Sequence, residues 1–386
     1  MVNKLKERFL EVFKVEGERV FFAPGRVNLI GEHTDYNGGH VFPCALDFGT
    51  YAIVKVREDK IIRAYSDNFE KLGILEFSID NLVNEEAHDW ANYPKGVVKC
   101  FMDAGFKIDR GFDVLFFGNI PNGAGLSSSA SIELATSVIL KGLFSLDIDM
   151  VSMVKLSQKA ENHFIGVNCG IMDQFAIGMG KKDRAILLDC NTLKFDYAPV
   201  VLENAAIVIT NTNKRRGLAD SKYNERRGEC ERALANLQTK LDIKSLGDLT
   251  EEEFEANKDL IPNEIDRKRA KHAVYENQRT IKAVEKLNSG DIEAFGKLMN
   301  ASHVSLRDDY EVTGIELDTA VEEAWKHEGT IGARMTGAGF GGCTVSIVKK
   351  DFVEDFIEKV GEAYKEKTGL TADFYIANIG DGAREL

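Results

Sequence analysis

Residues 23–39 gather side chains that could bind a sugar-like ligand. The segment follows a short apolar run and holds, within twelve residues, Arg26, Asn28, Glu32, His33, Asp35 and Asn37. Carboxylates accept hydrogen bonds from paired hydroxyls, and an imidazole can donate or accept one. We therefore predict that this loop binds a polyhydroxylated ligand, with a solvated turn as the alternative reading.

Residues 118–131, GNIPNGAGLSSSAS, form a loop suited to phosphate. They follow the strand-like run FDVLFF and precede a helix with apolar periodicity. Glycines let backbone amides approach an anion, and the free N–H groups and dipole of a helix N-terminus attract it. One serine would suffice as a helix cap. The four serines after Gly125 therefore favour phosphate binding, and one of them could bind Mg²⁺.

Two better-known nucleotide motifs are absent from the sequence. No GxxxxGK[ST] occurs, which excludes a Walker A loop. A literal GxGxxG runs from Gly337 to Gly342, but the strand-like run 343–348 follows it, where a dinucleotide fingerprint requires a helix. We expect the loop 335–343 to bring backbone close to a ligand or to another loop.

A carboxylate in an apolar setting adds a candidate catalytic group. Asp173 and Gln174 stand between Ile171, Met172 and Phe175, and Glu161 comes twelve residues earlier, at the end of a predicted helix. An acid in such surroundings can serve as an active-site acid or base. A helix cap or a buried structural pair is an equally open reading from the chemistry alone.

The elements that must position these loops follow from periodicity. The N-terminus is predicted to form an amphipathic helix, without the apolar run of a secretory signal. Strands are expected at residues 19–23, 51–57, 112–120, 184–190, 205–212, 343–348 and 372–379. Further helices are expected at 131–144, 150–165, 221–241, 265–287 and 351–367. Because strands and helices mix without regular alternation, we predict an α+β fold of two lobes, divided near residues 191–204.

Composition narrows the class of protein. The 386 residues include 62 acidic and 49 basic side chains, for a formal net charge of -13. A nucleic-acid binder usually needs a basic surface, so we expect no nucleic acid as partner. No apolar stretch has the length of a membrane span. The six cysteines are scattered without zinc spacing, which favours reduced, mostly buried thiols in a cytoplasmic protein.

Taken together, the motifs resemble the galactokinase family of the GHMP small-molecule kinase superfamily. PGRVNLIGEHTDYNGG resembles the family's sugar signature, GNIPNGAGLSSSAS the superfamily's ATP motif, and MTGAGFGGC its third motif, in the family's order. Ala338 departs from the glycine that many relatives carry. The resemblance implies an N-terminal lobe (1–195) similar to ribosomal protein S5 domain 2, a ferredoxin-like C-terminal lobe (196–386), and transfer of the ATP γ-phosphoryl group to the anomeric hydroxyl of galactose.

The resemblance also implies residue roles. Asp173 matches the catalytic aspartate, and Arg26 the arginine that stabilises the transferring group. Sugar contacts match Glu32, His33, Thr34, Asp35 and Tyr223, and the phosphate loop matches Gly123, Ala124, Gly125, Leu126, Ser127, Ser128 and Ser129. Ser129 and Glu161 match Mg²⁺ ligands, and Ser66 and Trp90 match the nucleotide side of the pocket.

Alternatives remain at this point. A catalytically inert sensor that binds galactose and ATP is disfavoured by the intact phosphate loop and by the presence of Arg26 and Asp173. A kinase for N-acetylgalactosamine depends on room around C2 of the sugar, which spacing does not reveal. We expect a monomer without an obligate protein partner. The remaining histidines are expected to be surface or capping residues: His88, His163, His272, His303 and His327.

Overall fold

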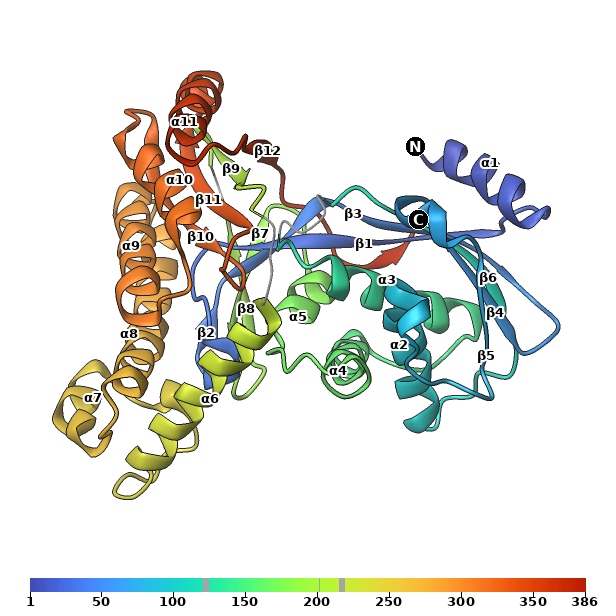
Figure 1. Ribbon diagram of the computed structural model, residues 1–386, viewed down its shortest axis with the longest axis horizontal. Coiled ribbons are helices and arrows are strands. Elements are labelled where there is room, and N and C mark those ends of the chain that lie inside the picture. Colours follow the sequence, from blue (N-terminus) through green and yellow to red (C-terminus); the bar gives the residue numbers. More distant parts are fainter. Residues whose placement is uncertain (121–124, 201, 215–218) are drawn as a thin grey trace.

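The computed structural model describes residues 1–120, 125–200, 202–214 and 219–386, so Gly123 and Ala124 lie outside the described residues. The chain forms an elongated molecule in which two long strands, β1 and β3, run from a helix-covered sheet at one end towards a second helix-rich part (Figure 1). The helices are α1 (Val2–Phe13), α2 (Asn92–Asp103), α3 (Ser128–Leu143), α4 (Met150–Ala160), α5 (Met172–Met179), α6 (Ala219–Leu237), α7 (Glu251–Asn257), α8 (Glu264–Asn288), α9 (Ile292–Ser305), α10 (Ile315–Lys326) and α11 (Val353–Thr368).

The first sheet has the strand order β13-β1-β3-β6-β4-β5. Its strands are β1 (Arg19–Asn28), β3 (Pro43–Val56), β4 (Ile61–Ser66), β5 (Leu75–Ser78), β6 (Phe112–Gly118) and β13 (Arg384–Glu385). Successive side chains of a strand face opposite sides of the sheet. Accordingly Val20 packs with Phe9 of α1, while Phe21 belongs to the core built with α2, α3 and α4. Both faces of this sheet are therefore covered.

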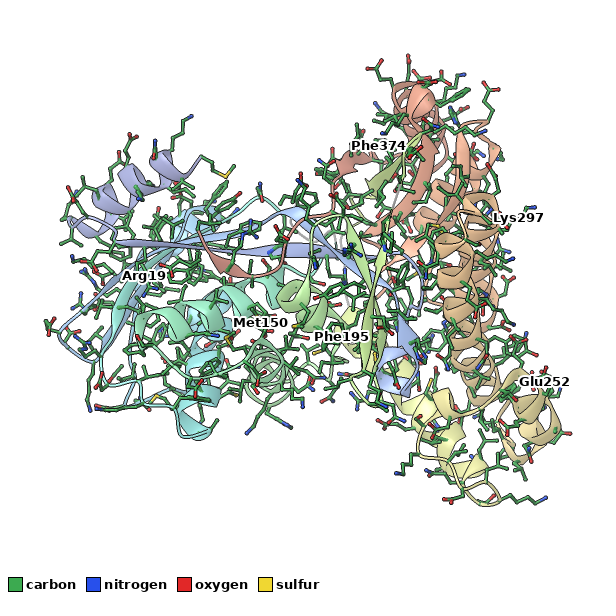
Figure 2. All side chains as sticks on the ribbon, turned by 180° about the vertical axis from the view of Figure 1, so that it is seen from behind. Arg19, Met150, Phe195, Glu252, Lys297 and Phe374 are labelled. Carbon is green, nitrogen blue, oxygen red and sulfur yellow. The ribbon has the colours of Figure 1, made fainter. Side chains whose placement is uncertain are left out.

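The second sheet has the order β10-β11-β9-β12, with antiparallel neighbours throughout. Its strands are β9 (Ala205–Asn211), β10 (Thr330–Thr336), β11 (Cys343–Lys349) and β12 (Asp373–Ala377). Ile207 and Val345 pack on one face with Phe295 of α9, and Val208 packs on the other with Phe356 of α11. Glu252 on α7 and Lys297 on α9 lie exposed on the outside of this part (Figure 2).

A third, small sheet has the strand order β2-β7-β8. It consists of β2 (His40–Val41), β7 (Arg184–Asp189) and β8 (Phe195–Pro199). At the end of the chain, β13 returns to pair with β1, so the C-terminus joins the first sheet (Figure 1). No helix in the described ranges combines the length and apolar character needed to cross a bilayer.

The mixed α+β class is confirmed, and each predicted strand and helix overlaps an observed element. One predicted helix ends early: α4 stops at Ala160, and a π turn, Glu161–Ile165, replaces its last residues. The strand after the third glycine-rich loop is confirmed as β11. Periodicity missed the helices α2, α5, α7, α9 and α10 and the strands β2, β4, β5, β8, β10 and β13. In α5 almost every residue is buried, so no polar face marks the helix.

Candidate functional site

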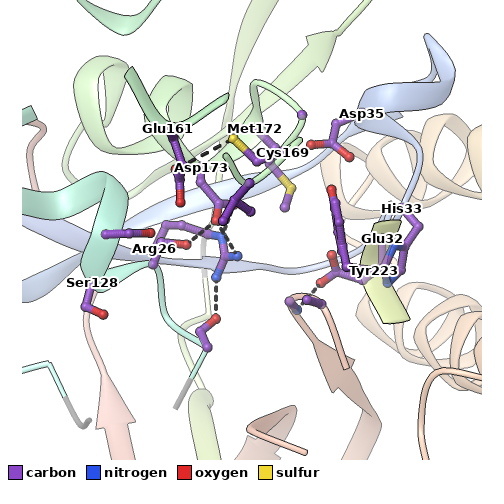
Figure 3. A pocket seen from close by; sticks show the side chains of 17 residues that line it. Arg26, Glu32, His33, Asp35, Ser128, Glu161, Cys169, Met172, Asp173 and Tyr223 are labelled. Atoms are coloured by element: carbon purple, nitrogen blue, oxygen red, sulfur yellow. Dashed lines mark hydrogen bonds and ion pairs between the residues drawn. The ribbon is translucent and has the colours of Figure 1, made fainter. Parts of the chain in front are cut away.

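A cavity of about 220 Å³ opens where three loops meet. They are the predicted sugar-binding loop (23–39), the serine-rich loop (118–131) and the third glycine-rich loop (335–343). Arg26 and Asp173 face each other at its centre (Figure 3). Glu32, His33, Asp35 and Tyr223 line it on one side, and Ser128 and Glu161 on the other. Segments far apart in the sequence thus meet in one site.

A bidentate ion pair forms the centre of the site. Arg26 Nε lies 2.8 Å from Asp173 Oδ1, and Arg26 Nη2 lies 3.0 Å from Oδ2. The third donor of the fork, Nη1, reaches the carbonyl of Gly125 at 2.8 Å. The strand register shifts between Pro24 and Arg26, and such a bulge re-aims a side chain. Asp173 stands in the first turn of α5 and stays partly exposed to the cavity.

Ser127 adds a further donor to this pair. Its hydroxyl donates to Asp173 Oδ2 at 2.5 Å, so both carboxylate oxygens are held before any ligand arrives. Ser127 has a φ of 63°, a conformation that L-residues seldom adopt, and it immediately precedes the first residue of α3, Ser128. The loop thus turns one serine towards Asp173 and starts the helix with the next.

The described part of the phosphate loop lies against the third glycine-rich loop. A Cβ on Gly337, whose φ is +84°, would lie 2.9 Å from the carbonyl oxygen of Gly125. The Leu126 side chain is buried in the core, and its carbonyl accepts from the backbone N–H of Arg26 at 3.2 Å. The two loops and β1 therefore pack backbone to backbone, where glycine is needed at 337.

Among the residues predicted to contact the sugar, Glu32 is fixed by several hydrogen bonds to one of its carboxylate oxygens. Its Oε1 accepts from Gly337 N at 2.8 Å, from Thr336 Oγ1 at 3.1 Å and from Arg334 Nη1 at 3.3 Å. Within the described ranges no donor reaches Oε2. The buried carboxylate thus has one oxygen fixed by the protein and the other left for a ligand.

Asp35 is fitted closely against the loop 166–171. A Cβ on Gly170 would lie 1.8 Å from Asp35 Oδ2, so only glycine leaves room for the carboxylate. Burial, followed by repulsion from Asp173, raises the pKa of Asp35 to about 7. Asp35 is therefore a half-buried carboxyl at the cavity edge that titrates near neutrality.

His33, Tyr223 and Thr34 differ in what they offer a ligand. The His33 and Tyr223 rings lie 5.6 Å apart between centroids, and both line the cavity. Burial, with help from His272, lowers the pKa of His33 to about 3, so its imidazole is neutral. The Thr34 hydroxyl is used within its own turn, where it donates to the carbonyls of Gly31 and His40.

Glu161 belongs to a buried acidic group beside the phosphate loop. Gln174 Nε2 donates to Glu161 Oε2 at 2.6 Å and to Glu133 Oε2 at 3.1 Å. Burial and the charge of Asp173 raise the pKa of Glu161 to about 7, while a hydrogen bond from Ser129 lowers it. Such a site favours a cation, because one would relieve the desolvated carboxylates.

A second cavity of about 220 Å³ adjoins the first at Ser128 and Ser129. Ser66 and Trp90 both line it, together with Phe69. The Phe69 and Trp90 rings are nearly parallel, at 19°, with centroids 6.4 Å apart. Trp90 Nε1 is buried and has no hydrogen-bond partner among the described residues. An aromatic wall with an unused donor suits a planar heterocycle.

Several residues that support the site were not predicted from the sequence. Arg334 is wholly buried on β10 and reaches Glu32; only its place just before the third loop could have pointed to it. The expectation of surface or capping positions is wrong for His272 and His303, which are both fully buried. His272 Nε2 lies 3.1 Å from the carbonyl oxygen of Glu32.

The two glycine-rich loops around an Arg–Asp pair, on this α+β architecture, define a GHMP-type small-molecule kinase. The GHMP kinases N terminal domain matches residues 92–181, and the GHMP kinases C terminal domain matches 281–366. The Methanococcus jannaschii mevalonate kinase, at 20% identity over 95% of this chain and 99% of that chain, has the same fold with a TM-score of 0.64.

Closer comparisons narrow the class. The galactokinase galactose-binding signature matches residues 7–56. A galactokinase of Fusobacterium nucleatum is 68% identical over the full length of both chains, and one of Bacillus subtilis is 60% identical over 100% of this chain and 99% of its own. The Lactococcus lactis galactokinase complexed with galactose superposes with a TM-score of 0.98 at 53% identity, over 100% of both chains. The chain belongs to the galactokinase family.

Proposed function

We propose that the chain transfers the γ-phosphoryl group of ATP to the anomeric hydroxyl of α-D-galactose, giving galactose 1-phosphate and ADP. One observation carries this proposal: the Arg26–Asp173 pair stands between a cavity lined by hydroxyl-binding groups and a serine-rich loop at a helix N-terminus. Phosphoryl transfer needs positioning and charge stabilisation more than covalent chemistry. This arrangement supplies both.

On the sugar side, the free Oε2 of Glu32 and the carboxylate of Asp35 accept hydrogen bonds from ring hydroxyls. His33 supplies a further polar contact from a neutral ring, and Tyr223 closes the cavity with its aromatic face. Thr34 holds the turn that carries these groups. Two carboxylates suit a neutral polyol, whereas an anionic substrate would be repelled.

Asp173 orients the reacting hydroxyl. Arg26 and Ser127 already donate to its carboxylate, which fixes the orientation of both oxygens, and the carboxylate takes the proton late. The sugar oxygen then bonds to the γ-phosphorus, the bond to the β-phosphate bridging oxygen breaks, and the hydroxyl proton passes to Asp173. Arg26 lies where its charge offsets that of the transferring group.

The nucleotide occupies the serine-rich loop and the second cavity. The described loop residues, Gly125 to Ser129, face the β- and γ-phosphates with backbone N–H groups and hydroxyls. The base then lies beside Ser66, Trp90 and Phe69 in the adjoining cavity. The shared lining at Ser128 and Ser129 supports this continuous path from base to sugar.

Mg²⁺ fits the donor set at Ser129 and Glu161. Oxygen ligands from one or two side chains, completed by phosphates and waters, are typical of Mg²⁺ in kinases. Within the residues that the structure describes, no group of three or more His, Cys, Asp or Glu side chains could hold a metal by itself, which is compatible with an ion that arrives with ATP. When bound, Mg²⁺ would neutralise phosphate charge.

We further propose a monomer working in the cytoplasm, with the chain divided into lobes at residues 1–195 and 196–386. The scattered and mostly buried cysteines support a reducing compartment. Sedimentation equilibrium of the purified protein, with and without ligands, tests the monomer.

An ADP-release assay with Mg²⁺-ATP tests the function. Galactose is expected to be the preferred acceptor over glucose, arabinose and N-acetylgalactosamine. Activity on none of these sugars would contradict the proposal, and activity confined to N-acetylgalactosamine would replace the substrate. The Asp173→Asn variant is expected to lose turnover in protein that is still folded, and its Tm should also fall because the substitution removes the charge partner of the buried Arg26.

A further inference from the structure

A chain of hydroxyl groups leads from His33 to residues that do not line the cavity. The Tyr36 hydroxyl is 2.8 Å from His33 Nδ1 and 2.7 Å from the hydroxyl of Tyr310. Cys230 Sγ, in turn, is 3.2 Å from the Tyr310 hydroxyl. These groups come from the 3₁₀ turn Asp35–Asn37, the π turn Leu306–Tyr310 and α6. Groups from three segments thus form a chain of contacts that ends, through Tyr36, at one imidazole nitrogen.

The surroundings fix the His33 ring as well as its nitrogen. The backbone of His33 has a φ of 61°, and its carbonyl accepts from Asn37 Nδ2 at 2.7 Å. The ring centroid lies 4.8 Å from that of Tyr310 and 5.6 Å from that of Tyr223. A residue held in a sparsely populated conformation marks a position that the surroundings over-determine, often at a functional site.

The chemistry of the pair decides which partner donates. A neutral imidazole has one N–H donor and one bare acceptor nitrogen. A phenol is a stronger acid than a neutral imidazole N–H, and the bare nitrogen is a stronger base than a phenol oxygen. The Tyr36 hydroxyl therefore donates to Nδ1 of His33 and accepts from Tyr310. That direction leaves the imidazole proton on Nε2.

Among the described residues, Nε2 is the His33 nitrogen that makes no hydrogen bond of good geometry, although the backbone of Ala338, which also lines the cavity, lies close enough to the ring to favour its protonated form. This nitrogen is buried, and His33 lines the sugar cavity. A buried N–H without a partner is costly, so a ligand hydroxyl that accepts from it would gain binding energy. The hydroxyl chain would then determine what kind of contact the sugar finds.

We propose that Tyr36 is a positioning residue for the sugar: its hydroxyl holds His33 in the Nε2–H tautomer and so presents a hydrogen-bond donor to galactose. The inference rests on the proposed role of His33 as a sugar contact. Tyr310 supports Tyr36 from behind, and Cys230 ends the chain. Neither Tyr36 nor Tyr310 lines the cavity, so neither touches the reacting atoms.

The test compares two tyrosine variants that each lose one hydroxyl. Tyr36→Phe is expected to raise KM for galactose about three- to ten-fold, since it removes one neutral hydrogen bond, with kcat and KM for ATP changing less than about two-fold. Tyr364→Phe is the matched control, because its buried hydroxyl donates to the carbonyl of Thr212 and neither residue is among those that line the cavity. It should lower Tm and leave both KM values as they are. Tyr310→Phe should raise KM for galactose less than Tyr36→Phe does.

Nitrogen-15 NMR of protein labelled at histidine reads the tautomer directly, with His33→Gln assigning the signal. The wild-type ring is expected to carry its proton on Nε2, and Tyr36→Phe to give a mixture of tautomers. A proton on Nδ1 in the wild type, or a Tyr36→Phe variant with an unchanged KM for galactose, overturns the proposal. If His33→Gln leaves KM for galactose unchanged, the sugar-contact role fails even where the tautomer is as expected.

Discussion

Replacing Arg26 by lysine tests the role of the Arg26–Asp173 ion pair. The substitution keeps the positive charge but removes the planar guanidinium, which can make several hydrogen bonds at once. The guanidinium makes three hydrogen bonds, two to the Asp173 carboxylate and one to the Gly125 carbonyl. A lysine ammonium can remake one of them. A hydrogen bond with a charged partner contributes about 1.5–3 kcal/mol, and water can replace part of the loss because Asp173 keeps 29% of its side chain exposed.

A loss of about 3 kcal/mol, the lower end for two bonds, corresponds to a kcat reduced about 150-fold. The assay is steady-state ADP release at saturating galactose and ATP, with Tm measured alongside. Arg63→Lys is the matched control, since Arg63 grips Asp113 through the same two nitrogens at 2.7 and 2.6 Å outside the cavity. It should lower stability without slowing turnover. An Arg26→Lys variant within about three-fold of wild-type kcat would refute the assigned role.

Three other outcomes follow from the geometry. Gly170→Ala places a methyl group against Asp35, so KM for galactose should rise at least about ten-fold with KM for ATP unchanged; equal rises in both would contradict the fit. Trp90→Ala opens the second cavity and should raise KM for ATP about ten-fold or more while KM for galactose stays constant in the same assay. Because the pKa of Asp35 is raised from 3.8 to about 7, the folded state holds a proton that the unfolded state has lost. The unfolding free energy should therefore fall as pH rises through this range, and Asp35→Asn should flatten that slope in urea titrations.

The local chemistry of each loop could be predicted from sequence because the relevant groups are close together in the chain. Glu32 and Asp35 stand three residues apart, and a glycine-rich loop before an apolar helix is a local pattern. The predicted helices and strands likewise depend on neighbouring residues. Elements without a polar face, such as α5, left no period to detect.

What the sequence could not reveal are the contacts across long separations. Arg334 is 302 residues from Glu32, yet it binds the same oxygen as the third loop does. His272 has an ordinary surface pattern around it, but it lies buried beneath the Glu32 carbonyl. Burial depends on how helices pack, which no linear spacing encodes. The supporting residues of the site therefore became visible only in the fold.

The fold also explains how a chain with a net charge of -13 can handle phosphate. Net charge describes the whole surface, whereas a bound phosphate responds to groups within about a Debye length, roughly 8 Å at physiological salt. Near the serine-rich loop these are the α3 N-terminus and the Arg26 guanidinium, joined in the proposed function by a cation at Glu161 and Ser129. The acids close by are already engaged, because Asp173 is paired with Arg26 and Glu161 accepts from Gln174. The acidic side chains therefore hold the positively charged groups in place near the phosphate. A basic protein surface is not required.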